Sequence, residues 1–238
     1  MGVCAIVVAP EGTPLRTSDA LERQTRQPDR VVFAGPGLPW EDASSGEETW
    51  LWFLDAGVAP QPEALERLLE FASGAGGLPA PALLAGKVVL PDGYLDARSL
   101  PTAKVRDPDL LVSALEQRVL SLRVARRGSL LVRRSAVGVP DGGSRRLDPM
   151  TDDLEWTARL LRDRPGLLVP GSVAVREPAA ERSPVGRDLA KRGRLLLGDA
   201  IELRDKPWFA FRFLEEALAG RRYRHRPPWL PGAEKRPA

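Results

Sequence analysis

A chain of 238 residues with 43% hydrophobic and 28% charged residues has the composition of a globular protein, with room for one large domain or one domain with an extension. The single cysteine, Cys4, and the single histidine, His225, exclude an intrachain disulfide, a thiolate zinc cluster and a histidine-based triad in the body of the chain. No apolar run approaches the roughly 20 residues of a membrane-spanning helix, and we expect a cytoplasmic protein.

The net charge of +3 is unevenly distributed along the chain. From Arg176 to the end there are fifteen Lys and Arg against nine Asp and Glu, so the last part is basic and the rest is slightly acidic. Such asymmetry favours a polyanionic partner for the basic part, either a membrane surface or a nucleic acid.

Strands and helices alternate along the first part of the sequence, which predicts an α/β sheet. The first half predicts strands over 2–9, 30–34 and 50–54 and helices over 14–26 and 62–73. The second half predicts strands over 83–90 and 129–132, helices over 110–122 and 151–163, and a strand pair or bent strand over 167–175. Two further helices are predicted near 188–203 and 207–219.

The chain is organised around Trp50 to Leu54, five large apolar residues that end on Asp55. A short continuous apolar run of this kind is typical of a central strand that is buried on both faces. Open α/β sheets bind ligands in the crevice at the carboxyl ends of their strands, so Asp55 is a candidate binding residue. A turn-forming role before Ala56-Gly57 is the alternative.

Several stretches in a fixed order carry a resemblance to a known family. They are Val7–Glu11, Gln24–Val32, Trp50–Leu68, Gly128–Arg134, Thr151–Leu160 and Val169–Arg176. Together they resemble the inverting family-two glycosyltransferases of the GT-A fold, particularly the rhamnosyltransferase-like branch. The resemblance implies a GT-A-type (Rossmann-like), mixed and mainly parallel sheet flanked by helices over 1–177. A basic, aromatic and helical C-terminal extension follows over 178–238.

The resemblance implies transfer of a sugar from a nucleotide-diphosphate donor to an acceptor hydroxyl, in cell-envelope or polysaccharide synthesis. It assigns Asp153, with Asp152 beside it, as the catalytic base that takes the proton of the acceptor hydroxyl. It also assigns a set of nucleotide-sugar-binding positions, namely Pro10, Glu11, Gly35, Asp55, Gly57 and Arg176. For Asp152 and Asp153 the alternative is that they are acids favoured by the dipole in the first turn of a helix.

The metal site that the resemblance implies is incomplete in this sequence. The family's Asp-x-Asp motif is Asp55-Ala56-Gly57 here, and Arg176 stands where the family has a metal-ligating histidine. Asp55 alone would then hold Mg²⁺ or Mn²⁺ weakly, together with the phosphates. Metal-independent activity is the alternative, because the Arg176 guanidinium can bind phosphate directly. A surface charge at the boundary of the extension is a third interpretation of Arg176.

Two functional hypotheses therefore stand at this point: an active glycosyltransferase, and an inactive GT-A-like domain that acts as a binding or scaffold subunit. Expected partners are the nucleotide-sugar donor and a glycan or lipid-linked acceptor. Aromatic and basic residues of the extension, such as Trp208 and Arg221, suit an anionic membrane surface on the inner face of the cell membrane. Packing of these aromatics on the domain is the alternative, and no nucleic acid is expected.

Overall fold

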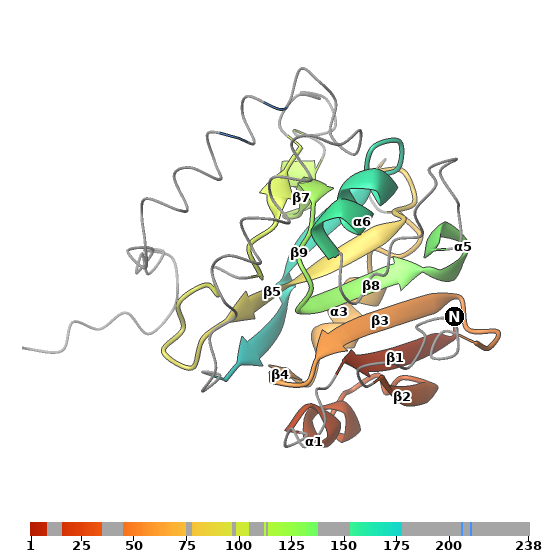
Figure 1. Ribbon diagram of the computed structural model, residues 1–238, viewed down its shortest axis with the longest axis vertical. Coiled ribbons are helices and arrows are strands. Elements are labelled where there is room, and N and C mark those ends of the chain that lie inside the picture. Colours follow the sequence, from red (N-terminus) through yellow and green to blue (C-terminus); the bar gives the residue numbers. More distant parts are fainter. Residues whose placement is uncertain are drawn as a thin grey trace, which may run out of the picture.

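A computed structural model describes residues 1–8, 16–34, 45–74, 78–96, 99–104, 112, 114–137, 153–177, 206 and 210. These residues form one mixed sheet with helices on both faces (Figure 1). The strands are β1 (Val3–Val8), β2 (Arg30–Ala34), β3 (Trp50–Asp55), β4 (Val58–Pro60), β5 (Leu83–Val89), β6 (Thr102–Ala103), β7 (Leu120–Val124), β8 (Ser129–Arg133) and β9 (Gly166–Arg176). The helices are α1 (Arg16–Glu22), α3 (Ala64–Leu69), α5 (Arg134–Val137) and α6 (Asp153–Leu160).

The strand order is β2-β1-β3-β8-β5-β9-β7-β6, and β4 also pairs with β9. Strands β1, β2, β3, β5, β6 and β9 run in one direction, whereas β4, β7 and β8 run in the other. The mainly parallel, mixed sheet that the sequence predicts is therefore confirmed. One consequence matters for function: the start of β8 lies at the same edge as the carboxyl ends of its neighbours β3 and β5.

Strand β3 is the centre of the core, as predicted from its unbroken apolar run. Trp50, Trp52 and Leu54 face a cluster that includes residues of α1 and α3, whereas Leu51 and Phe53 face a second cluster that includes residues of α6. All five of these side chains are at most 1% exposed. Because both faces of β3 are covered, the strand is rigid, and the carboxylate that ends it is held in a fixed position.

The stretch after residue 110 differs from its prediction. The sequence predicts a helix over 110–122, with Leu115 and Leu122 on its buried side. In the structure residues 112 and 114–116 are helical, as predicted, but Leu120–Val124 is strand β7, in which Leu122 is buried, and Leu115 is 57% exposed. The run Val119 to Val124 contains β-branched residues and pairs with β9, so tertiary pairing outweighed the helical spacing of the leucines. Strands β4 and β6 were not predicted either, and both are only two or three residues long.

The final strand is one bent strand, which was one of the two predicted alternatives. Its register on β5 shifts at Gly86/Lys87, where Val169 and Val173 become partners of successive residues. The irregular residues include Ser172, whose hydroxyl donates to the Ala64 carbonyl at 2.8 Å. The bulge redirects the second half of β9 along β5 and β4, and this second half ends at Arg176.

A buried amide connects α1 to the segment between β4 and α3. The Gln24 Nε2 donates to the Gln61 carbonyl at 2.7 Å and to the Ala20 carbonyl at 3.1 Å, and Gln24 Oε1 accepts from the Leu65 N–H at 3.1 Å. Gln24 is only 5% exposed. Buried backbone groups need such partners, so this side chain positions two elements that border the sheet.

We predict that Gln24→Ala lowers the free energy of unfolding by about 1–3 kcal/mol, because it leaves the buried Leu65 N–H without its acceptor and removes one of the two donors to the Gln61 carbonyl. Urea unfolding measures the change. Gln27→Ala is the matched control: the Gln27 amide donates to the Glu22 carbonyl at the exposed surface, so its loss is worth less than about 0.5 kcal/mol. Equal losses in the two variants would contradict the structural role of Gln24.

Candidate functional site

Charged side chains from five segments meet at the carboxyl ends of β3 and β9. Asp55 ends β3, Arg176 ends β9, and Arg127 lies just before the start of β8. Asp96 follows β5, and Asp153 begins α6. The antiparallel direction of β8 places its start among the carboxyl ends of neighbouring strands, so Arg127 lies beside Asp55 although 72 residues separate them.

The two oxygens of Asp55 bind two different guanidinium groups. Arg127 Nε donates to Oδ1 in a short hydrogen bond, and Arg176 Nη2 donates to Oδ2 at 2.8 Å. The Asp55 side chain is 17% exposed, and those of Arg127 and Arg176 are 26% and 12% exposed. Charge-assisted bonds of this kind are stronger than neutral ones, and partial burial reduces screening by water.

Arg176 is held from a second side by Asp96 and Ser99. Its Nη2 also donates to Ser99 Oγ at 2.9 Å, and the same hydroxyl donates to Asp96 Oδ2 at 3.0 Å. The Arg176 Nε lies 2.5 Å from Asp96 Oδ2, but its N–H does not point at that oxygen, so the pair is electrostatic rather than hydrogen-bonded. Within the described part of the chain, these contacts use Nη2 and Nε of Arg176 and leave its Nη1 without a hydrogen-bond partner.

Asp153 belongs to the same network through the backbone of Arg127. Its Oδ2 accepts the Arg127 N–H at 3.1 Å, while the Arg127 side chain binds Asp55. Arg127 therefore connects the two carboxylates that the sequence analysis selected, Asp55 and Asp153. Asp55 and Asp153 therefore lie at the same edge of the sheet.

The ionised form of Asp55 is favoured despite its burial. Desolvation is the largest influence and raises the pKa, but the charges of Arg127 and then of Arg176, with their hydrogen bonds, together outweigh it and hold the pKa below the usual 3.8. A carboxylate whose pKa is depressed in this way stabilises the fold at neutral pH.

Gly128 makes room for this network. A Cβ atom at this position would lie 2.8 Å from Ser99 Oγ, 3.0 Å from Val88 Cγ2 and 3.3 Å from Arg176 Nη2. Only glycine allows the start of β8 to approach the Arg176 guanidinium so closely. Gly57 differs, because a Cβ atom there would have no neighbour within 4 Å. Its carbonyl accepts the Glu177 N–H at 3.0 Å, and the space above it is open.

The described residues do not fit a divalent cation at Asp55. Both carboxylate oxygens already accept hydrogen bonds from guanidinium groups, so a cation bound there would lie against two positive charges. No group of three or more His, Cys, Asp or Glu residues in the described ranges is arranged as a metal site. The expectation of Mg²⁺ or Mn²⁺ at Asp55 is therefore not supported by the donor set.

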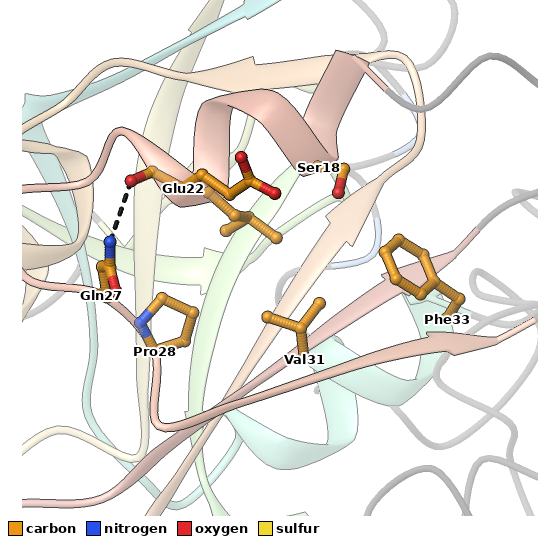
Figure 2. A pocket seen from close by; sticks show the side chains of 7 residues that line it. Ser18, Glu22, Gln27, Pro28, Val31 and Phe33 are labelled. Atoms are coloured by element: carbon orange, nitrogen blue, oxygen red, sulfur yellow. Dashed lines mark hydrogen bonds between the residues drawn. The ribbon is translucent and has the colours of Figure 1, made fainter.

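A pocket of about 230 Å³ lies away from this site, between α1 and the edge strand β2 (Figure 2). Apolar side chains, among them Leu21, Val31 and Phe33, line it, with Ser18 and Glu22 contributing polar groups. Val31 and Phe33 are 39% and 43% exposed, so the pocket is a shallow feature of the sheet edge.

The other predicted site positions divide into two groups. Pro10, Glu11, Gly35 and Asp152 lie outside the described residues, as does the extension apart from residues 206 and 210. Gly57 lies in the turn after Asp55, at the same edge of the sheet. Arg127 and Asp96 were not predicted as site residues. The only sequence signal for Arg127 is its position just before strand β8. This position indicates a site residue only once the strand order is known.

Comparison with solved structures reveals the same architecture in known enzymes. The chain superposes on GalNAc-T7, crystallised with UDP, GalNAc and Mn²⁺, with a TM-score of 0.53 at 12% identity, covering 92% of this chain and 52% of that one. It superposes on S. aureus TarS with a TM-score of 0.57 at 12% identity, covering 92% of this chain and 44% of that one. On residues 1–349 of TarS in complex with UDP-GlcNAc, the TM-score is 0.57 at 12% identity, and the match covers 94% of this chain and 74% of that one.

This chain has the GT-A fold. It spans about half the length of GalNAc-T7 and of the longer TarS chain. No family model matches the sequence, and no curated protein sequence matches it. At 12% identity the structural likeness concerns the fold, and the chemistry has to be argued from the site itself. Among the described residues, no helix is long and apolar enough to cross a membrane.

We predict that Asp55→Asn lowers the free energy of unfolding at pH 7 by on the order of 3 kcal/mol, because two partly buried guanidinium groups lose their shared counter-charge. The depressed pKa stabilises the wild type fully above pH 3.8, and this contribution is lost as the pH falls through the folded-state pKa. The difference between the two proteins should therefore shrink below about pH 4 in urea unfolding. Asp163→Asn, at an exposed ion pair, should change stability by less than about 0.5 kcal/mol. A difference that stays constant with pH would contradict this assignment.

We also predict that Gly128→Ala costs about 1–3 kcal/mol, since the new methyl group would press on Ser99 and Arg176. Gly57→Ala, in open space, should change the free energy of unfolding by less than about 0.5 kcal/mol. Thermal and urea unfolding of the two variants measure the contrast. A wild-type-like Gly128→Ala protein would show that the network is not tightly packed.

Proposed function

We propose that this chain is a glycosyltransferase that moves a sugar from a nucleotide-diphosphate donor to an acceptor hydroxyl. The observation that supports the proposal is the network that links Asp55, Arg176, Arg127 and Asp153 at the ligand-binding edge of a GT-A sheet. Two carboxylates and two guanidinium groups lie where an anionic donor and an acceptor alcohol would meet. The fold comparison supports the same class of reaction.

In this proposal Asp153 is the general base. The acceptor oxygen attacks the anomeric carbon, the bond from that carbon to the diphosphate oxygen breaks, and the diphosphate leaves with the electron pair. The acceptor proton passes to the Asp153 carboxylate. The Arg127 N–H orients that carboxylate by donating to one of its oxygens. A single displacement of this kind inverts the anomeric configuration, as the resemblance to family-two enzymes implies.

The finer assignments belong to the same proposal. UDP-sugars are the first donors to test, because GalNAc-T7 was crystallised with UDP and TarS with UDP-GlcNAc. The sequence resemblance supports hexosyl or rhamnosyl transfer in the cytoplasm, in cell-envelope or polysaccharide synthesis. Pro10, Glu11, Gly35 and Gly57 would bind the nucleotide sugar, and Asp152 would assist Asp153. The extension from residue 178 would form a separate basic segment that brings the domain to an anionic membrane with a glycan or lipid-linked acceptor.

The second candidate is an inactive GT-A-like domain that binds a partner or serves as a scaffold. One observation favours it: Glu48, at the opposite end of the sheet, is also bound by two arginines, Arg30 and Arg134. The carboxylate–arginine network at Asp55 would then be a structural clamp of the same kind. Nucleotide binding without turnover, or no binding, would favour this candidate.

The direct test is a thermal-shift and calorimetric screen of UDP, GDP, dTDP and ADP and of UDP-GlcNAc. Ligands that bind the folded state raise the apparent stability by mass action, by about 2.7 kcal/mol at a ligand concentration of 100 times Kd. A hit on one nucleotide, followed by release of that nucleotide from its sugar donor in the presence of acceptors, supports the proposal. The absence of binding to every member of the panel would overturn it.

We predict that Asp153→Asn abolishes sugar transfer, with a loss of at least about 100-fold in kcat, while nucleotide binding and folding stay intact. The asparagine oxygen can still accept the Arg127 N–H, so the network is preserved, but the base is lost. Glu155→Gln is the matched control on the same helix; its carboxylate pairs with Arg159 at 3.2 Å, and transfer should continue. Wild-type turnover by Asp153→Asn would remove this residue from the mechanism.

A further inference from the structure

We infer that the Arg176 guanidinium, with Arg127 beside it, takes the place of a divalent cation at the donor diphosphate, so that the nucleotide binds without metal. The inference rests on the proposed function, because it concerns the same donor. The inference goes beyond the proposed function because it names the side chain that binds the phosphate oxygens of the donor. The resemblance does not supply this role, because it places a metal-ligating histidine at the position of Arg176.

The charge balance of the four groups around Asp55 and Arg176 supports the replacement. Asp55 and Asp96 contribute two negative charges, and Arg127 and Arg176 contribute two positive ones. The sum is the same as that of one divalent cation between two carboxylates. Without the arginines, two partly buried carboxylates would repel a diphosphate, whereas with them this part of the site is neutral before the donor arrives.

The geometry of Arg176 suits a phosphate ligand. Its Nη2 is held by Asp55 and Ser99, and its Nε lies against Asp96, so the plane of the guanidinium is fixed. The Nη1 atom has no hydrogen-bond partner within the described part of the chain. It is also not one of the fully buried polar atoms without a partner, so it is accessible. A fixed guanidinium with accessible N–H groups is a strong donor to phosphate oxygens, and its orientation costs little entropy on binding.

A bound metal and the two arginines would repel one another at Asp55. A cation at Oδ1 or Oδ2 would share an oxygen that already accepts a hydrogen bond from Arg127 or Arg176. It would also lie within contact distance of two positive charges. The same carboxylates become available once Arg176 is removed, because Asp55 Oδ2 and Asp96 Oδ2 both face its nitrogen atoms, at 2.8 and 2.5 Å.

Isothermal titration calorimetry of the whole chain with UDP, GDP, dTDP and ADP tests the inference, first in EDTA and then with Mn²⁺ or Mg²⁺. Binding in EDTA, with a Kd that changes less than about threefold when metal is added, supports it. Binding only in the presence of metal overturns it and leaves the glycosyltransferase proposal standing. No binding under either condition overturns the proposed function, and the inference with it.

Removing the guanidinium gives a sharper result. In Arg176→Ala we expect nucleotide binding in EDTA to weaken by more than about tenfold. We expect Mn²⁺ to restore it, because Asp55 and Asp96 then form a two-carboxylate site. The loss of the free Mn²⁺ signal in electron paramagnetic resonance measures metal binding directly and independently of nucleotide. Wild-type protein should leave that signal unchanged at the same concentration.

Two further variants keep the test decisive. Arg16→Gln removes an exposed arginine that pairs with Glu177, next to Arg176 in sequence, and should leave nucleotide binding in EDTA unchanged. If Arg176→Ala fails to fold, Arg176→Lys retains the charge but loses the planar fork, and we expect binding weaker by about tenfold without rescue by Mn²⁺. Unchanged binding by folded Arg176→Ala or Arg176→Lys would overturn the inference.

Discussion

The carboxylate of Asp55, held between two guanidinium groups, is the interaction on which the candidate site depends. It joins β3, β9 and the segment before β8, and these come together only in the folded sheet. Strand β3 provides the fixed point, because its five apolar side chains are buried on both faces. A carboxylate on a mobile loop could not orient two arginines at once, whereas one at the end of a fully buried strand can.

The two ends of β3 show how similar networks can differ in function. Glu48, before the strand, is bound by Arg30 and Arg134, and hydrogen bonding to Arg30 is the first cause of its lowered pKa. That cluster lies at the amino ends of the parallel strands, away from the edge at which open α/β sheets bind ligands. The Asp55 cluster lies at the binding edge, contains a second acid at the start of a helix, and includes a guanidinium nitrogen without a partner among the described residues. Position and an unused donor, rather than the ion pairs themselves, distinguish a candidate site from a clamp.

The sequence predicted the central elements well because their signals are local. The apolar run before Asp55 and the order of the resembling stretches predicted the parallel strands β1, β2 and β3 and placed Asp55, Asp153 and Arg176 at the ends of their elements. The start of strand β7 lies inside a predicted helix, because the leucines of this stretch have helical spacing and the pairing of β7 with β9 is a tertiary effect. Arg127 was missed for the same reason. Its importance arises from the antiparallel direction of β8, which no local pattern reveals. The roles of Asp153 and Arg176 in chemistry remain proposals, since geometry alone places them.

The proposed replacement of a cation by an arginine would change more than the source of charge. A divalent ion can be exchanged and concentrates two charges on one small centre, whereas a guanidinium is permanent, spreads one charge over a plane and donates in fixed directions. Stabilisation of a departing diphosphate should therefore depend more on alignment and less on field strength. Asp96 and Ser99, which fix the plane of Arg176, and Gly128, which admits it, then become part of the recognition of the donor. In this proposal the absence of a second carboxylate at Gly57 has the same explanation, because a site without a dication does not need that ligand.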